Sequence, residues 1–429
     1  MTNSKLKDSN IEWLGKIPSN WNLIKGKYLF TLRTTKGNTK QVELLSPTQE
    51  YGVIPQKLYE KLTGMRPVKL KSNTDLNQMK SIYKGDFCIS LRSFQGGFEY
   101  SNYDGIVSPA YQVFYPSKQV NRNYFKYLFK DKSFIQKLNS YTMSLRDGKN
   151  IAFSDFGNTY LPFPALDEQN KIADFLDKKV SQIDNLSKNI QQEITDLEEY
   201  RKSIITKAVT TGLNKNIQMK DSNIDYINKM PNTWHLTRLK YILTERNQRS
   251  IDGKELLLSV SQKKGILPAY QVKRSIKANS LVGYKIVKQN DLVFNKLNPA
   301  LARFGVSNYN GITSPDFSVY YSNKINIQFL SFLLKTSKYV TEYKRLCSGV
   351  GEGYTRLYTP TLYNIKVALP TIKEQNKIVN ILNKKDQKIK KLMEKQKRLL
   401  LTLTQYKQSL IYEYVTGKKQ VSSKESAKA

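Results

Sequence analysis

Two stretches of the chain place an apolar residue at every seventh position, and this pattern constrains the fold more than any other feature. The first stretch runs from Ile172 to Val209, and an equivalent stretch begins 206 positions later, at Ile378. Neither contains an interior glycine or proline, and an apolar period of seven over this length is typical of a coiled-coil helix. The 38 residues of the first stretch predict a helix about 57 Å long. Gly212 and Gly417 follow the two stretches and are expected to end the helices in the left-handed conformation.

The period, together with the Glu-Gln pair repeated just before each stretch, gives the positions through which the two helices are expected to contact each other or a partner. They are Glu168, Gln169, Ile172, Leu176, Ile183, Ile190, Leu197 and Ile204 in the first helix, and Glu374, Gln375, Ile378, Leu382, Ile389, Leu403 and Leu410 in the second. Leu186, Ile194, Tyr200 and Ala208 are predicted to fill the same stripe of the first helix, and Leu392, Leu399 and Tyr406 are predicted to form a second seam on the second helix.

The duplication extends beyond the helices to the whole chain. Of the 24 residues from Lys7 to Phe30, 11 recur without a gap between Lys220 and Leu243, where about one or two identities would arise by chance. The chain is therefore predicted to contain two copies of one unit, each a globular domain followed by a long helix. The predicted division is a first domain over 1–163, a first helix over 164–213, a second domain over 214–369, a second helix over 370–419 and a disordered tail over 420–429.

Within each domain, short strand-like runs alternate with helical patterns, which predicts an α+β fold. In the first domain a strand is expected over Asp86–Ser90 and a single helix over Asn123–Leu138. In the second, the equivalents are a strand over Asp291–Asn295 and a helix over Ile327–Leu346. If the two long helices pair antiparallel, the second returns to the first domain. The expected architecture is two similar mixed α/β domains separated by an antiparallel coiled coil, with pseudo-twofold symmetry.

Charge indicates what the domains bind. The chain holds 70 Lys and Arg residues against 35 Asp and Glu residues, a net charge of +35. Residues 1–166 carry +12 and residues 213–372 carry +15, so most of the excess belongs to the domains rather than the helices. Such an excess favours a polyanion over a small neutral ligand. The absence of a long apolar run, the polar N-terminus and the two unrelated cysteines favour a cytoplasmic protein without membrane contact.

Catalytic motifs are weak in this sequence. The glycine-rich run over 348–353 follows a helical segment rather than a strand, and Asn298-Pro299 lacks the second proline and the aromatic residue of a base-flipping methyltransferase loop. Asp316 and Glu342 have the residue types of a metal-dependent nuclease, but Glu342 falls in a predicted helix. The single histidine, His235, is expected to be a surface or packing residue. No cofactor or metal site is predicted in this chain.

Polar loops that interrupt the strands are the predicted DNA-reading elements. Arginine can donate two hydrogen bonds to guanine, and asparagine or glutamine can donate one to N7 of adenine and accept one from its N6 amino group, whereas lysine suits phosphates. The candidate DNA-binding residues are Arg92, Ser93, Gln95, Arg146, Lys149, Asn150, Arg246, Gln248, Arg249, Asn295, Lys296, Asn298, Arg303, Tyr354 and Arg356. The two copies differ most in such loops, as two readers of different sequences on a common scaffold would.

The tandem arrangement resembles a specificity subunit of a type I restriction–modification system over essentially the whole chain. The resemblance rests on Pro-x-x-x-Glu-Gln-x-x-Ile, found from Pro164 and again from Pro370, and on Pro-x-x-Trp, found at Pro18 and Pro231. The family often carries an arginine shortly before the last strand of each domain; Arg356 matches it, but the first copy has Asn150 there.

The resemblance implies a non-catalytic subunit with two target-recognition domains, each reading one half of an asymmetric bipartite site in double-stranded DNA. The coiled coil would set the spacer and bind two methyltransferase subunits, which carry S-adenosylmethionine. Separate restriction subunits would use ATP and Mg²⁺. On this interpretation, one heptad added to both helices, about 10 Å, should lengthen the accepted spacer by about three base pairs.

Two other interpretations compete with this one. A single-chain DNA methyltransferase or nuclease with an unrecognised catalytic site would transfer methyl groups or cut DNA unaided. A basic coiled-coil assembly protein would instead prefer RNA or a membrane surface over duplex DNA.

Overall fold

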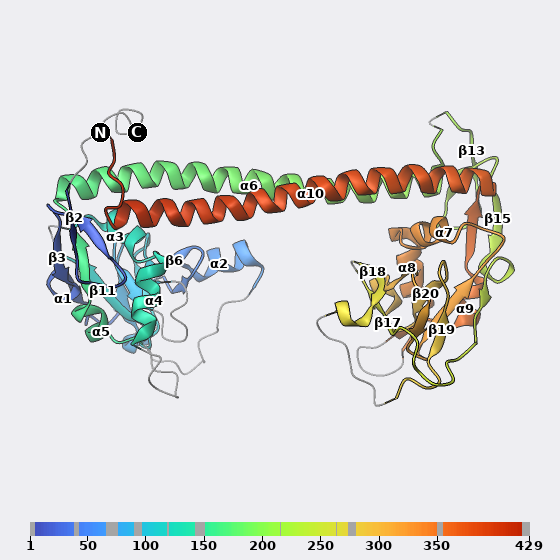
Figure 1. Ribbon diagram of the computed structural model, residues 1–429, viewed down its shortest axis with the longest axis horizontal. Coiled ribbons are helices and arrows are strands. Elements are labelled where there is room, and N and C mark those ends of the chain that lie inside the picture. Colours follow the sequence, from blue (N-terminus) through green and yellow to red (C-terminus); the bar gives the residue numbers. More distant parts are fainter. Residues whose placement is uncertain are drawn as a thin grey trace. The chain divides into compact units, whose positions relative to one another are not determined.

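The computed structural model describes residues 5–37, 43–65, 76–89, 97–117, 120–141, 151–214, 216–262, 264–272, 280–349 and 355–422 (Figure 1). The chain divides into two compact units. Unit 1 comprises residues 1–191 and 398–429, and unit 2 comprises residues 192–397. Each unit therefore contains one globular domain and one half of the pair of long helices. Within the described ranges, no helix has both the length and the apolar content needed to cross a membrane.

The domain of unit 1 combines short strands with short helices. Its strands are β1 (Leu6–Asp8), β2 (Lys16–Pro18), β3 (Asn22–Lys25), β4 (Phe30–Leu32), β5 (Leu45–Thr48), β6 (Gly52–Pro55), β7 (Lys80–Ile82), β8 (Phe87–Ile89), β9 (Glu99–Tyr100), β10 (Gly105–Val107), β11 (Gln112–Pro116) and β12 (Tyr160–Phe163). Its helices are α1 (Gly26–Leu29), α2 (Gln56–Thr63), the 3₁₀ helix η1 (Leu76–Gln78), α3 (Arg122–Leu128), α4 (Lys132–Ser140) and α5 (Phe153–Asn158), before the long α6 (Leu166–Thr211).

The domain of unit 2 repeats this arrangement. Its strands are β13 (Met219–Asp221), β14 (Lys229–Pro231), β15 (His235–Arg238), β16 (Thr244–Glu245), β17 (Leu258–Ser261), β18 (Gly265–Pro268), β19 (Lys285–Val287), β20 (Leu292–Asn295), β21 (Phe304–Val306), β22 (Gly311–Thr313), β23 (Phe317–Tyr321), β24 (Ser348–Gly349), β25 (Thr355–Arg356) and β26 (Lys366–Leu369). Its helices are the 3₁₀ helices η2 (Leu239–Tyr241), η3 (Ala269–Gln271) and η4 (Pro299–Leu301), then α7 (Ile327–Leu334), α8 (Ser337–Leu346) and α9 (Thr359–Asn364), before the long α10 (Ile372–Val415).

The same antiparallel sheet lies at the centre of both domains. Its strand order is β4-β11-β8-β9 in unit 1 and β16-β23-β20-β21 in unit 2. A separate pair joins an early strand to the strand that precedes the long helix, β3 with β12 and β15 with β26. The prediction of two similar α+β domains is therefore confirmed.

Aromatic packing explains one of the repeated sequence motifs. Trp21 and Trp234, which end the two Pro-x-x-Trp motifs, are both fully buried. Trp21 lies edge-on to Tyr124 on α3, and Trp234 lies edge-on to Phe329 on α7, with ring centroids 6.5 and 6.2 Å apart. The motif therefore packs the start of each domain against the helix that follows its central sheet.

The predicted helices over Asn123–Leu138 and Ile327–Leu346 are wrong as single elements. Each is two helices, α3 and α4 in unit 1 and α7 and α8 in unit 2. In unit 1 the side chain of Asp131 accepts hydrogen bonds from the backbone N–H groups of Ser133 and Phe134, 2.9 and 3.2 Å away. This N-cap starts a new helix at that point. The apolar period continues across both helices, so the period alone did not show the break between them.

The long helices pair antiparallel within each unit, which confirms the predicted coiled coil. In unit 1 the rings of Phe175 and Tyr414 lie 4.5 Å apart, and further along Asp184 pairs with Lys407 at 2.6 Å. In unit 2 Gln396 donates a hydrogen bond to Glu193 at 2.6 Å, and Arg201 on α6 pairs with Asp386 on α10. In each unit residue numbers rise along α6 as they fall along α10, which is the register of an antiparallel pair.

The helix ends and most seam positions follow the period. α6 begins at Leu166, six residues before the apolar period starts at Ile172, and ends before Gly212 at φ +77°; Gly417, at φ +72°, follows α10. The seam residues Ile172, Leu176, Ile183, Ile190, Ile378, Leu382, Ile389 and Leu410 are buried, and Leu197, Ile204 and Leu403 are half-buried. Of the residues expected to fill the stripe of the first helix, Ile194 and Ala208 are buried, but Leu186 and Tyr200 are exposed. Leu392, Leu399 and Tyr406 of the expected second seam are exposed too, and the five exposed fractions are 42 to 53%. The prediction is wrong for these five residues because two paired helices cover only one stripe of each other.

Candidate nucleic-acid interface

An arginine–aspartate pair occupies the same place in both domains. Arg246 donates to the two carboxylate oxygens of Asp291 at 2.8 and 3.0 Å, and its guanidinium lies over the ring of Tyr321 at 4.6 Å. Arg33 and Asp86 make the same two bonds in unit 1, at 2.7 and 2.9 Å. Asp291 is 3% exposed, so opening this pair would leave a buried charge without its partner. These contacts favour a structural role for Arg246, and its role in DNA binding stays a prediction.

Four candidate residues from distant segments meet beyond the end of β20. Asn295 ends that strand, and Leu297 pairs with Arg356 of β25 in an antiparallel bridge. Asn298 donates its backbone N–H to the carbonyl of Thr355 at 2.8 Å, and its side chain accepts the N–H of Thr355 at 3.0 Å. The structure thus brings Asn295, Lys296 and Asn298 beside Arg356, although about 60 residues separate them in the sequence.

This cluster carries excess positive charge. Arg356 pairs with the exposed Asp316 at 3.4 Å, and its Nε is buried with no partner among the described residues. Lys285, which sequence reasoning missed, pairs with Glu245 at 3.1 Å. Burial, with Lys285 and Arg356 nearby, lowers the pKa of Lys296. We call Lys285, Lys296 and Arg356, with Asn295 and Asn298, the β20 cluster. The ammonium of Lys296 and the guanidinium of Arg356 are donors that suit phosphate oxygens or the acceptors on base edges.

The remaining candidates of unit 2 that the structure describes are exposed. Arg249 donates to the carbonyl of Gly283 at 2.8 Å, and Gln248 precedes it with an exposed side chain. Arg303 is exposed, and its carbonyl accepts the N–H of Asn295 at 3.1 Å, which places it just before β21 and beside the β20 cluster. The other candidates, Arg92, Ser93, Gln95, Arg146, Lys149, Asn150 and Tyr354, lie outside the described residues.

The residues considered for catalysis are separated. Asp316 pairs with Arg356, whereas Glu342 lies on α8 and accepts two hydrogen bonds from Arg345 at 2.6 and 2.9 Å. In the part of the chain that the structure describes, no three His, Cys, Asp or Glu side chains gather as a metal site would require. His235 is exposed on β15.

The start of each long helix is fixed to its own domain by the Glu-Gln signature. Gln169 is fully buried; its Oε1 accepts the backbone N–H of Asn121 and its Nε2 donates to the carbonyl of Pro164, both at 2.9 Å. Gln375 makes the equivalent two bonds with Asn326 and Pro370, again at 2.9 Å. Glu374 accepts a hydrogen bond from the indole N–H of Trp234 at 3.4 Å, and Glu168 is half-buried.

Comparison with solved structures shows the same fold. A chain from a structure on complex assembly and conformational transition of the type I restriction–modification system aligns with 94% of this chain and 99% of its own length, at a TM-score of 0.68 and 13% identity. The HsdS subunit from Thermoanaerobacter tengcongensis aligns with 96% of this chain and 100% of its own length, at a TM-score of 0.54 and 14% identity.

Two curated relatives are similar in sequence. The type I restriction enzyme MjaVIII specificity subunit of Methanocaldococcus jannaschii is 26% identical over 292 residues, which are 61% of this chain and 67% of that protein. The StySPI specificity subunit of Salmonella potsdam is 24% identical over 280 residues, which are 62% of this chain and 58% of that protein. A family model for the type I restriction modification DNA specificity domain matches residues 18–196 and again residues 231–402. The chain therefore belongs to the family of type I restriction–modification specificity subunits, with one copy of the DNA specificity domain in each half of its sequence.

Proposed function

We propose that each unit reads one half of an asymmetric, bipartite site in double-stranded DNA, and that the length of the coiled coil sets the spacer between the halves. A specificity subunit is the non-catalytic, sequence-reading member of its complex. On this proposal the chain binds no cofactor of its own, and base contacts in unit 2 come from the β20 cluster.

The observation that carries this proposal is that the two units share one backbone fold but differ in the side chains at equivalent positions. The Arg–Asp pair and the order of the central sheet are common to both. Beside that pair, unit 2 has Glu245 and Ser318 where unit 1 has Leu32 and Gln112. Glu245 holds Lys285 and Ser318 at 3.1 and 2.9 Å. A scaffold that is kept while its polar surface changes suits two readers of unlike sequences.

The long helices supply a surface for protein partners. In unit 1 the exposed apolar residues on them are Leu166, Leu186, Leu399, Leu401 and Tyr406; in unit 2 they are Tyr200, Ile372 and Leu392. Apolar side chains left uncovered on a paired helix favour a partner helix. We propose that each unit binds one methyltransferase subunit here, with S-adenosylmethionine held by that subunit. Restriction subunits using ATP and Mg²⁺ would join this cytoplasmic complex.

Methylation mapping tests the proposed function. The chain is expressed with its methyltransferase subunit, and the methylated adenines in the host DNA are located. The expected result is one asymmetric sequence in two parts separated by a spacer of constant length. The chain alone with S-adenosylmethionine should transfer no methyl group to DNA. A continuous or palindromic target, or methyl transfer by the isolated chain, would contradict the proposal.

Substitution Arg356→Ala is expected to weaken binding of the full chain to its target about tenfold and to relax selectivity at one base pair. A forked arginine contact to a base contributes about 1–3 kcal/mol of discrimination. Competition binding against targets changed at each position measures both effects. Arg356→Lys keeps the positive charge but cannot donate two parallel hydrogen bonds to one base. It should therefore restore affinity more than selectivity. Equal losses for all target sequences would assign Arg356 to the DNA backbone instead.

Substitution Lys296→Ala is expected to act on all DNA sequences alike. If its ammonium group neutralises one phosphate, the slope of log K against log salt should fall by about 0.9. Titrations of the full chain at several salt concentrations measure that slope. Lys220→Ala, at an exposed position on β13, is the matched control and should leave the slope unchanged. An unaltered slope for Lys296→Ala would remove Lys296 from the interface.

A further inference from the structure

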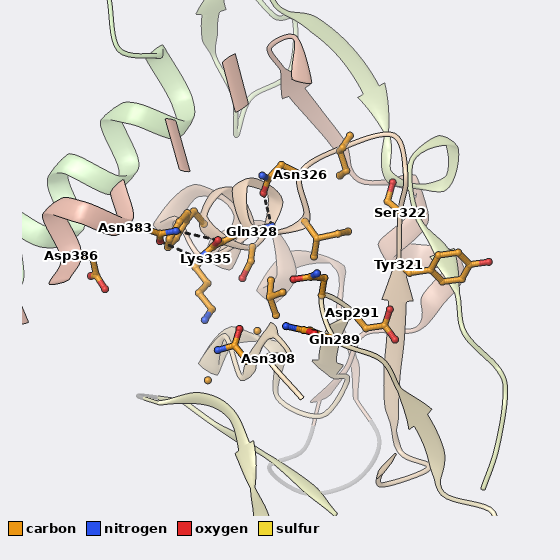
Figure 2. Close-up of a pocket in the computed structure, with 18 of the residues that line it drawn as sticks. Gln289, Asp291, Asn308, Tyr321, Ser322, Asn326, Gln328, Lys335, Asn383 and Asp386 are labelled. Carbon is orange, nitrogen blue, oxygen red and sulfur yellow. Dashed lines mark hydrogen bonds between the residues drawn. The ribbon is translucent and has the colours of Figure 1, made fainter. Parts of the chain in front are cut away.

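A pocket of about 930 Å³ opens in unit 2 where the domain faces the long helices. α7, the turn before β20 (Lys288–Asp291) and the end of β21 line one side of it, and Arg201 of α6 and Asn383, Asp386 and Lys390 of α10 line the other. Figure 2 shows the side chain of Lys335, just after α7, extending into this pocket. Gln289, Asn308 and Gln328 add amide groups around it.

The carboxylates in the pocket wall already have partners. Asp291 holds Arg246 at 2.8 Å, and Asp386 pairs with Arg201 and with Lys390, the latter at 2.8 Å. Lys335 has no carboxylate partner among the described residues, and its ammonium lies 5.4 Å from the centre of the Phe304 ring. Burial, followed by the charges of Arg201 and Lys390, lowers the pKa of Lys335 to about 8. A half-buried ammonium beside two other cations is a site for an anion.

The equivalent lysine in unit 1 shows which kind of anion can occupy this position. Lys130 lies nine residues after the N-cap Asn121, as Lys335 lies nine residues after the N-cap Asn326. Lys130 is paired with Glu99 on β9 at 2.8 Å, and Glu99 is buried. The equivalent strand is β21, and there the residue in the place of Glu99 is Gly305.

The alignment of Glu99 with Gly305 is independent of the two lysines. Each lies two residues before a fully buried serine, Ser101 or Ser307, whose hydroxyl donates to the carbonyl two residues further on at 2.7 or 2.8 Å. Unit 2 has therefore kept the lysine and lost the carboxylate, and Gly305 forms part of the pocket wall.

We propose that a carboxylate side chain of a partner protein enters the unit 2 pocket and pairs with Lys335, in the position that Glu99 fills within unit 1. This inference rests on the proposed function, since the partner is the methyltransferase subunit that binds the long helices. A carboxylate is favoured over a DNA phosphate because the counterpart of this lysine in the same frame pairs with a carboxylate. The contact exists in one unit only, so it would distinguish the two methyltransferase sites.

Lysine labelling tests the pairing in the full chain. At pH 8 about half of the Lys335 amine is unprotonated and reacts with an amine reagent, and mass spectrometry follows the rate at each lysine. Addition of the methyltransferase subunit is expected to slow labelling of Lys335 at least about fivefold and to leave the exposed Lys220 unchanged. Unchanged labelling of Lys335 in a complex that forms would overturn this inference alone. Failure of the wild-type chain to bind the subunit would overturn the proposed function as well.

A second test introduces into unit 2 the carboxylate that pairs with Lys130 in unit 1. A Cβ at Gly305 would meet its nearest atoms at 3.6 and 3.8 Å, which is ordinary van der Waals contact, and Gly305 borders the pocket into which a longer side chain can extend. Gly305→Glu should give Lys335 an internal partner and weaken binding of the methyltransferase subunit about tenfold. Gly305→Gln, of equal size without the charge, should weaken it by no more than about threefold. Equal effects of the two variants, or protection of Lys335 by duplex DNA alone, would overturn the proposal.

Discussion

A chain with one heptad inserted after Gln191 in α6 and one after Lys397 in α10 is expected to lose its natural target and to prefer a spacer about three base pairs longer. These two positions are opposite each other in the antiparallel register, so the insertion keeps the seam continuous. Seven residues add about 10 Å to a helix, which corresponds to about three base pairs of DNA. Affinity for the original site should fall at least about 100-fold, because only one half-site can then be bound. Selection from a DNA library with randomised spacers measures the change.

The helical twist of DNA gives this experiment a second expected result, the affinity of the best site for each variant. Three base pairs rotate the second half-site by about 100° around the duplex, whereas a heptad returns the helices to nearly the same face. The best site for the one-heptad variant should therefore bind more weakly than the natural site does in the natural chain. Three heptads add about 31 Å, close to one DNA turn, and should recover part of that loss. A control that exchanges the seven residues from 192 onward without changing length should keep the natural spacer. Retention of that spacer by the inserted variants would exclude the coiled coil as its determinant.

The features that sequence alone predicted are those set by local rules. The seven-residue period identified both long helices, and Gly212 and Gly417 identified their ends because each takes a positive φ. The repeat predicted that the two domains would share one fold, because equal sequence patterns have equal packing requirements. Trp21 and Trp234 were visible as paired motifs, although only the structure shows that they are packing residues.

The features that sequence did not predict depend on contacts between distant residues. The β20 cluster brings Asn298 and Arg356 together, and neither position indicates the other in the sequence. Arg246 resembled a base-reading residue because the pairing with Asp291, 45 positions away, is a tertiary contact. Leu392 and Leu399 belong to an apolar period, but a period cannot say which of two stripes the other helix covers.

Substitution Gln375→Leu is expected to destabilise unit 2 by about 3–5 kcal/mol while leaving the length of α10 unchanged. The side chain is 2% exposed and bonds both the N–H of Asn326 and the carbonyl of Pro370. Leucine fills the same space but leaves both backbone groups buried without a partner, at about 1–3 kcal/mol each. For a unit of this size the melting temperature should fall by about 10 °C. Hydrogen exchange read by mass spectrometry measures the loss, with peptides of unit 1 as an internal reference.

Lys377→Ala is the matched control, because Lys377 is exposed two positions further along the same helix and should change stability by less than about 0.5 kcal/mol. Gln169→Leu should produce the same loss in unit 1, with unit 2 as its reference. The glutamine fixes the angle at which each domain leaves its long helix, since it ties the helix start to the N-cap of α3 or α7. That angle must be the same in both units whatever sequence each one reads, which explains why the Glu-Gln signature is repeated while the loops differ. Equal protection of unit 2 amides in Gln375→Leu and Lys377→Ala would show that the domains are oriented by other contacts.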